Sequence, residues 1–185
     1  MPESHDHNRL ARIARWGRIC VIGALLILVG VLSYAVISLV AQPDASWAYL
    51  GEEYEVSDVL GPRNSAKLWI IAGIHSLTDI LGGVILWTAL GLFALFGRGQ
   101  VFTEETVSRL RRIGWCLFAM APVSILGQTI AVAIFTFANE AGARRVSVGF
   151  SDTDAYAIVV GLIIVAASLA MAEALRLARE NESFV

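Results

Sequence analysis

Charged residues are scarce in this chain: Asp, Glu, Lys and Arg make up 16% of its 185 residues. Soluble domains carry about 25%. Intrinsic disorder is excluded, because it requires few apolar residues and a high net charge. The net charge of −2 also excludes a surface built throughout to bind nucleic-acid phosphates directly. With only two cysteines, Cys20 and Cys116, a disulfide-stabilised secreted module is excluded as well.

Motifs for catalysis and metal binding are also missing. The sequence has no His-Glu-x-x-His, no Cys-x-x-Cys and no Gly-x-Ser-x-Gly. The pair nearest to a nucleophile and its base is Ser76 beside His75. Adjacent residues of a helix point about 100° apart, so these two side chains would not face each other. We therefore expect no enzymatic activity, no metal site and no cofactor.

Long apolar runs dominate what is present. The residues Ala, Val, Ile, Leu, Met, Phe, Trp, Tyr and Cys make up 57% of the chain, and the mean hydropathy is +0.68. Crossing a hydrocarbon core of about 30 Å takes about 20 helical residues. Four runs are long enough, at about 19–41, 68–96, 113–137 and 155–174. The first is longer than the apolar region of a signal peptide, so we interpret it as a retained span. The fold predicted is all-α: a polytopic membrane protein that folds as an antiparallel bundle of four transmembrane helices.

The basic residues predict the orientation of this bundle. Ten of the 14 Lys and Arg residues fall in segments 1–18, 97–112 and 175–185, and the other four fall in the acidic loop 42–67 and in 138–154. Because Lys and Arg concentrate in cytoplasmic loops, both termini are predicted to be cytoplasmic. Residues 1–18 and 175–185 would be cytoplasmic tails flanking a membrane domain at 19–174, with 1–8 unstructured. We expect a multi-pass protein of the bacterial inner membrane, in contact with the lipid bilayer.

Small residues at helical spacing predict which side of each span faces its neighbours, because small side chains let membrane helices approach closely. The first span has such a stripe at Cys20, Gly23, Ile27, Gly30 and Tyr34. The third has one at Ala121, Ser124, Gln128 and Ala131, and the fourth at Ala157, Gly161, Val165, Ser168 and Ala172.

Polar residues inside a span are costly and are therefore functional candidates. The clearest are His75 and Asp79, which lie one helical turn apart in the second span and could touch. One hypothesis is that they relay a proton or bind a small ligand, together with Ser76 and Thr78 and with Gln128 across the bundle. The other is structural: Asp79 bonds a neighbouring hydroxyl or amide and fixes the register of the helices.

The cytoplasmic segment before the third span, which we call the elbow, has a distinctive pattern. Thr103 is a good N-cap, and two acidic residues follow it in the first turn. Phe102 and Val107 occupy the positions of a hydrophobic staple. Candidate docking residues in the elbow and the last helix are Phe102, Thr103, Glu104, Glu105, Arg109, Arg111, Arg112, Glu173 and Arg176. The elbow could bind anionic lipid or a cytosolic protein, and Glu173 and Arg176 are predicted to form an ion pair.

Two stretches of the sequence resemble a known family. The run VFTEETVSRLRRIGW at 101–115 and the ending EALRLARENESFV at 173–185 are similar to an uncharacterised bacterial membrane family, domain of unknown function 2975. The resemblance implies four spans over nearly the whole chain. Members are often encoded beside small helix-turn-helix regulators, which implies a cytosolic DNA-binding partner. The family has no established catalytic residues, so the resemblance assigns none here.

Two functional hypotheses remain open. The first is a non-enzymatic interaction or signal-relay protein that works with a cytosolic partner, through the elbow and the C-terminal tail, and that could also form a homo-oligomer. The alternative is a small proton-coupled transporter or amphiphile-binding protein that uses Asp79 and His75.

Overall fold

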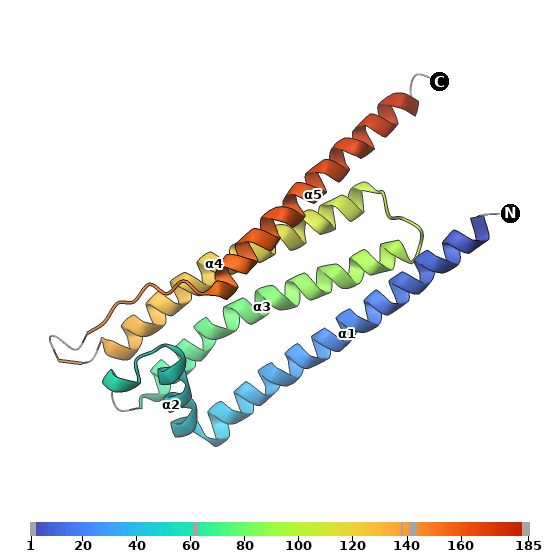
Figure 1. The fold of residues 1–185 in the computed structure, drawn as a ribbon. Helices are drawn as coiled ribbons and strands as arrows, with labels where there is room; N and C mark the ends of the chain where they lie inside the picture. The colour runs from blue at the N-terminus through green and yellow to red at the C-terminus, as the bar shows by residue number, and fades with distance from the viewer. Residues whose placement is uncertain (1–2, 61–62, 138, 141–143, 183–185) are drawn as a thin grey trace.

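A computed structural model describes residues 3–60, 63–137, 139–140 and 144–182 of the chain. The described residues form helices and loops, without a strand (Figure 1). The elements are α1 (Glu3–Ala41), α2 (Pro43–Glu53), the short 3-10 helix η1 (Ser57–Val59), α3 (Ser65–Phe96), α4 (Glu104–Thr136) and α5 (Asp152–Glu182). Four of these helices, α1, α3, α4 and α5, are long and apolar enough to cross a membrane. The predicted all-helical bundle of four spans is confirmed.

Each long helix extends beyond the apolar run from which it was predicted. The shortest, α5, has 31 residues, which gives a length of about 46 Å against a hydrocarbon core of about 30 Å. Helix α1 begins at Glu3, so the expectation that residues 1–8 are unstructured is wrong from Glu3 onward. The helical pattern of the first span simply continues through the polar residues that precede it. Residues 1–2 and 183–185 of the two predicted tails lie outside the described residues.

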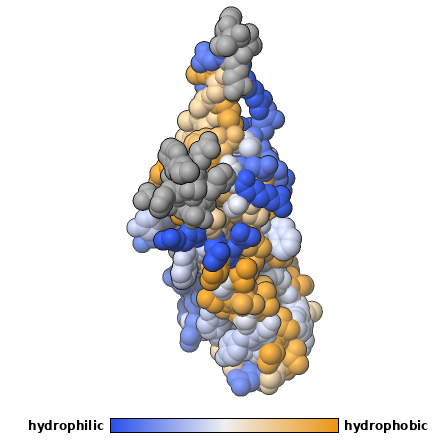
Figure 2. Space-filling view, turned by 90° about the vertical axis from the view of Figure 1, so that its right-hand side faces the viewer, coloured by the Kyte–Doolittle hydropathy of each residue, from blue (hydrophilic) through white to orange (hydrophobic). Residues whose placement is uncertain are grey.

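Both termini lie at the same end of the bundle, because the four long helices alternate in direction (Figure 1). We call this the inner end and the opposite one the outer end, following the orientation predicted from the basic residues. The view onto the inner end shows strongly hydrophilic residues gathered across its middle and mostly apolar or pale residues below them (Figure 2).

The four long helices pack mainly in the order α1, α3, α4, α5, and the contact between α4 and α5 is the most extensive (Figure 1). Helix α1 is therefore peripheral. Only 6% of its most apolar stretch is buried, against 17% in each of the other three spans. The exposed faces carry large apolar side chains such as Leu26, Trp87 and Ile163, as expected of helices surrounded by lipid.

The predicted contact face of α1 is wrong. Ile27 and Tyr34 are 70% and 73% exposed, and a Cβ atom built on Gly23 or Gly30 would meet nothing within 4 Å. A different face of α1 packs on α3. It buries Ala14 and Val21 and brings Gly17 against the Phe93 ring, and Leu28 approaches Gly83. Small residues recur on more than one side of this helix, so their spacing alone did not identify the buried side.

The predicted contact faces of α4 and α5 are confirmed. Ala121, Ala131 and Ser168 are fully buried and Val165 is 8% exposed. The two backbones come close together at a pair of glycines. A Cβ atom on Gly161 would lie 2.8 Å from the Gly114 carbonyl oxygen, and one on Gly114 would lie 2.9 Å from the Gly161 carbonyl oxygen. Neither position therefore has room for a side chain.

A hydrophobic cap closes the outer end. Helix α2 and the turn after it bury Trp47, Leu50, Tyr54 and Val56 against α3 and α4, and the rings of Trp47 and Phe135 lie 4.7 Å apart. The sequence predicted only an acidic loop over 42–67. Its acidic residues are exposed, but its apolar residues pack the segment onto the bundle.

Candidate functional site

At the inner end, the start of α4 and the end of α5 form a groove. Because the two helices are antiparallel, the elbow lies beside the last turns of α5. The groove has a volume of about 450 Å³, and its lining residues are Glu104, Val107, Ser108, Arg111, Ala172, Leu175, Arg176, Arg179 and Glu180. We call it the inner groove. It joins two segments that the sequence had marked separately as docking candidates.

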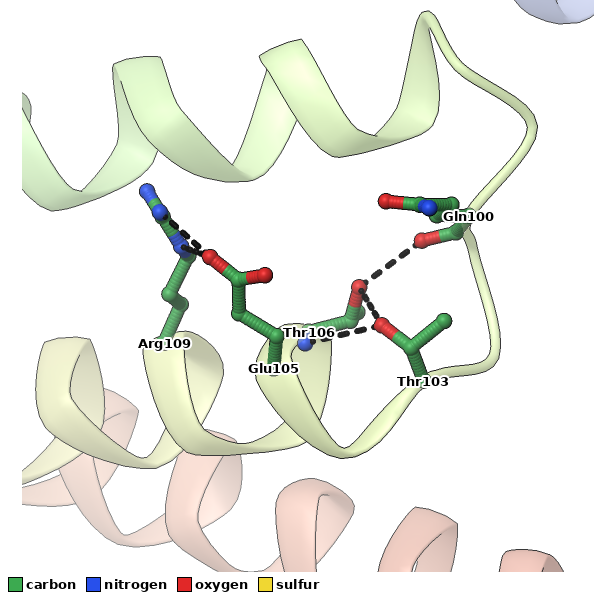
Figure 3. A network of polar contacts seen from close by, with 5 residues as sticks. All are labelled: Gln100, Thr103, Glu105, Thr106 and Arg109. Atoms are coloured by element: carbon green, nitrogen blue, oxygen red, sulfur yellow. Dashed lines mark hydrogen bonds and ion pairs between the residues drawn. The ribbon is translucent and has the colours of Figure 1, made fainter.

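The elbow is fixed by hydrogen bonds at the start of α4 (Figure 3). The Thr103 hydroxyl accepts a bond from the Thr106 backbone N–H at 3.2 Å, which confirms the predicted N-cap. The Thr106 hydroxyl donates to the Gln100 carbonyl at 2.9 Å and closes the turn. The predicted staple is not formed. Phe102 is 71% exposed, whereas Val107 is buried and lines the groove against α5.

Glu105 and Arg109 lie outside the groove, on the side of α4 that faces α3 (Figure 3). Nη2 of Arg109 bonds a Glu105 carboxylate oxygen at 2.6 Å. The guanidinium group rests on the bare backbone of Gly91, where a Cβ atom would lie 1.5 Å from Nη1. This pair therefore helps to hold α3 and α4 together at the inner end.

One ion pair joins the elbow to the end of α5, and two more lie within α5 beside it. Arg179 bonds the Glu104 carboxylate at 2.5 Å across 75 positions of sequence. Arg176 pairs with Glu173 at 2.6 Å, as predicted, and with Glu180 at 3.4 Å. These pairs are exposed, so each contributes little stability. Of these three pairs, the one between Glu104 and Arg179 joins α4 to α5, whereas the two pairs of Arg176 lie within α5.

Arg111 differs from the other arginines of the inner groove. It forms no ion pair with any residue that the structure describes. Its Nε atom is buried and has no hydrogen-bond partner. A buried donor without a partner is destabilising, because it has lost its hydrogen bonds to water and no bond within the protein replaces them.

Of the predicted docking residues, the structure thus brings together Glu104, Arg111 and Arg176 in the inner groove. Glu173 lies at its edge through its bond to Arg176. Phe102 and Arg112 are exposed outside it. Sequence reasoning missed Arg179 and Glu180. The spacing of Ala172, Arg176 and Arg179 along one side of α5 was the signal that could have found them.

A second, smaller cavity lies under the outer cap. It has a volume of about 240 Å³, and its lining includes Glu53, Tyr54, His75, Thr78, Ser124, Gln128, Ser151 and Asp154. We call it the outer cavity. The Tyr54 hydroxyl lies 3.4 Å from Nδ1 of His75. Burial raises the pKa of Tyr54 to about 12, and the charge of neighbouring Glu53 adds to the effect. Tyr54 therefore stays protonated and can donate to the imidazole at neutral pH.

Asp79 lies away from the outer cavity. It is half-buried, and among the described residues it makes neither the predicted contact with His75 nor the hydrogen bond of a structural clamp. The Ser76 hydroxyl also lies outside the lining and donates to the Gly73 carbonyl at 2.9 Å. Of the five candidates, the structure brings His75, Thr78 and Gln128 together in this lining.

The α5 side of the outer cavity comes from segments that sequence reasoning did not connect with it. The Asp154 carboxylate accepts bonds from the Ser151 backbone N–H at 2.9 Å and from the Ser151 hydroxyl at 2.7 Å. The Ser151 hydroxyl accepts in turn from the Asp154 N–H. This reciprocal cap starts α5 and places two polar side chains in the lining. Its Ser-x-x-Asp pattern was the available signal.

A family model described as "Protein of unknown function (DUF2975)" matches residues 54–185, which include α3, α4 and α5 and the lining of both cavities except Glu53. No curated protein matches the chain, and no solved structure matches it.

Proposed function

The chain belongs to the DUF2975 family of proteins of unknown function, and from the geometry of its inner end we propose that it is a non-enzymatic relay in the bacterial inner membrane. In this proposal both termini are cytosolic. The elbow and the last turns of α5 together dock a cytosolic partner.

The observation that carries the proposal is the meeting of two distant segments in one groove. Glu104 and Arg179 bond directly although they are far apart in the sequence. A partner that contacts both helices would sense how far apart they lie. Any shift of α4 against α5 within the membrane would therefore change the docking surface.

The exposed groups around the groove favour a helical partner. Phe102 offers a large apolar side chain that is 71% exposed. The groove lining carries charges of both signs, with Glu104 exposed on the elbow and Arg176 exposed on α5. An apolar anchor beside mixed charges suits an amphipathic helix laid along the groove. A small helix-turn-helix protein, which the family resemblance implies, is built of such helices.

Photo-crosslinking in living cells tests the proposal. A photoreactive amino acid replaces Phe102, and in a matched control it replaces Trp87, which is 72% exposed but lies on the part of α3 inside the membrane. We expect the first probe alone to capture a cytosolic protein, and we expect Arg179→Glu to weaken that capture. Equal labelling from both positions, or capture of lipid alone at position 102, would refute docking at this end.

The outer cavity favours a second candidate function, the binding of a small amphiphile. Its lining combines the imidazole of His75 and the amide of Gln128 with apolar walls from Ile74 and Val123. Proton coupling through Asp79 gains no support, since Asp79 is outside this lining. His75→Gln should abolish the rise in melting temperature that a bound amphiphile causes, whereas Asp79→Asn should leave that rise unchanged. A thermal-shift screen with amphiphiles measures both.

A further inference from the structure

We propose that the inner groove binds the phosphate group of an anionic phospholipid, and that Arg111 is its main ligand. The inference goes beyond docking of a cytosolic protein and does not depend on it.

The buried Nε atom of Arg111, which lacks a hydrogen-bond partner, is the first reason. Arg111 lines the groove and forms no ion pair with the described residues. A guanidinium group presents a planar fork of N–H donors that fits phosphate oxygens in pairs. An anion in the groove would give the guanidinium group the ion-pair partner that the described residues do not provide.

The charge and shape of the groove are the second reason. Its charged lining consists of three arginines and two glutamates, so it is basic. Both glutamates are in ion pairs, with Arg179 and Arg176, which leaves the charge of Arg111 unmatched. The remaining walls include Val107, Ala172 and Leu175. A ligand with an anionic head and an apolar body matches such a lining.

The level of the groove in the membrane is the third reason. Trp115 follows Arg111 by about one turn on α4 and is 50% exposed, which places it in the aromatic belt at the bilayer surface. Arg111 then lies at the depth of the lipid phosphates on the inner side. Lipid is present there at high concentration, whereas free phosphate or an acidic peptide must bind from solution.

The test uses the full chain, purified without other proteins and placed in nanodiscs that contain phosphatidylglycerol and phosphatidylcholine. Native mass spectrometry counts the lipids that stay bound. We expect phosphatidylglycerol to be retained preferentially, and Arg111→Gln to reduce this preference about tenfold, as expected for the loss of one charge-assisted bidentate contact. Arg112→Gln is the matched control, since Arg112 is exposed on the same elbow but outside the groove. It should keep the preference.

A second variant guards against misfolding of Arg111→Gln. Ala172→Leu narrows the groove and leaves every charge in place, and it should also reduce retention of phosphatidylglycerol. Equal losses in the Arg111 and Arg112 variants would show attraction by surface charge alone and overturn the proposal. If inorganic phosphate binds in a way that depends on Arg111, and no lipid is preferred, the ligand is free phosphate and the lipid proposal is wrong.

Failure of this proposal can be told apart from failure of docking. No cytosolic protein is present in the lipid assay, so its result says nothing about the partner. If Arg111→Gln abolishes capture from position 102 in cells but keeps the lipid preference, Arg111 binds an acidic group of the partner and the lipid proposal is wrong.

Discussion

Replacement of Gly161 by Ala should weaken the contact between α4 and α5, because the two backbones come close together there. The new Cβ atom would lie 2.7 Å from the Phe118 backbone nitrogen and 2.8 Å from the Gly114 carbonyl oxygen. Both are backbone atoms, which cannot rotate away as a side chain would. The helices must therefore move apart by several tenths of an ångström, and contacts along the interface are lost with them.

The magnitude follows from two opposing effects. Overpacking of a tight contact costs about 1–3 kcal/mol, whereas Gly→Ala within a helix gains up to about 1 kcal/mol. We expect Gly161→Ala to lower the free energy of unfolding by about 1–2 kcal/mol. Gly23→Ala is the matched control, because a Cβ atom there meets nothing within 4 Å and only the gain in helix propensity remains. Gly23→Ala should be neutral or slightly stabilising.

Unfolding in mixed micelles, followed by circular dichroism, measures both variants. The reasoning is refuted if Gly161→Ala is as stable as Gly23→Ala. It also requires that Gly114→Ala destabilise by a similar amount. The two substitutions should be less than additive when combined, because they open the same contact.

Three further predictions concern other parts of the bundle. Gly91→Ala should displace the Arg109 guanidinium and cost at most about 1 kcal/mol, since the ion pair it disturbs is partly exposed; a loss above 2 kcal/mol in the same unfolding assay, about twice that limit, would contradict this. Trp47→Ala should remove the ring that packs on Phe135, cost about 3–5 kcal/mol and open the outer cap to limited proteolysis, with the inner end still resistant. The pKa of Tyr54 is raised from 10.0 to about 12 in the folded protein, so its contribution to stability is complete below pH 10 and is lost as the pH rises toward 12. Tyr54→Phe should reduce the fall in the free energy of unfolding between pH 10 and pH 12. An unchanged slope over that pH range would show that Tyr54 does not cause the fall.

The spans could be predicted from the sequence because length and apolar content are set by the thickness of the bilayer. The contact faces could be predicted only in part. In α5 the small residues and the buried residues coincide, at Gly161 and Ser168. In α1 small residues occur on two sides, and the side that packs is decided by the Phe93 ring that fits over Gly17. Phe93 belongs to α3, so the sequence of the first span alone could not identify the buried side.

The candidate sites were predictable to a similar degree. The elbow was found because capping follows local rules, as at Thr103. The bond between Tyr54 and His75 was not predictable, since it depends on α2 folding back over the bundle. The predicted contact of His75 with Asp79 failed for the same reason: the imidazole turns toward the cap rather than along its own helix.

Because α1 is peripheral, it is held in the bundle less strongly than the other three long helices. This helix packs mainly on α3 and buries little of its surface, so it takes less free energy to detach than any other span. Under mild denaturation α1 should leave first, with α3, α4 and α5 still assembled around both cavities. Because the inner groove is lined by α4 and α5 alone, the loss of α1 would leave the groove intact.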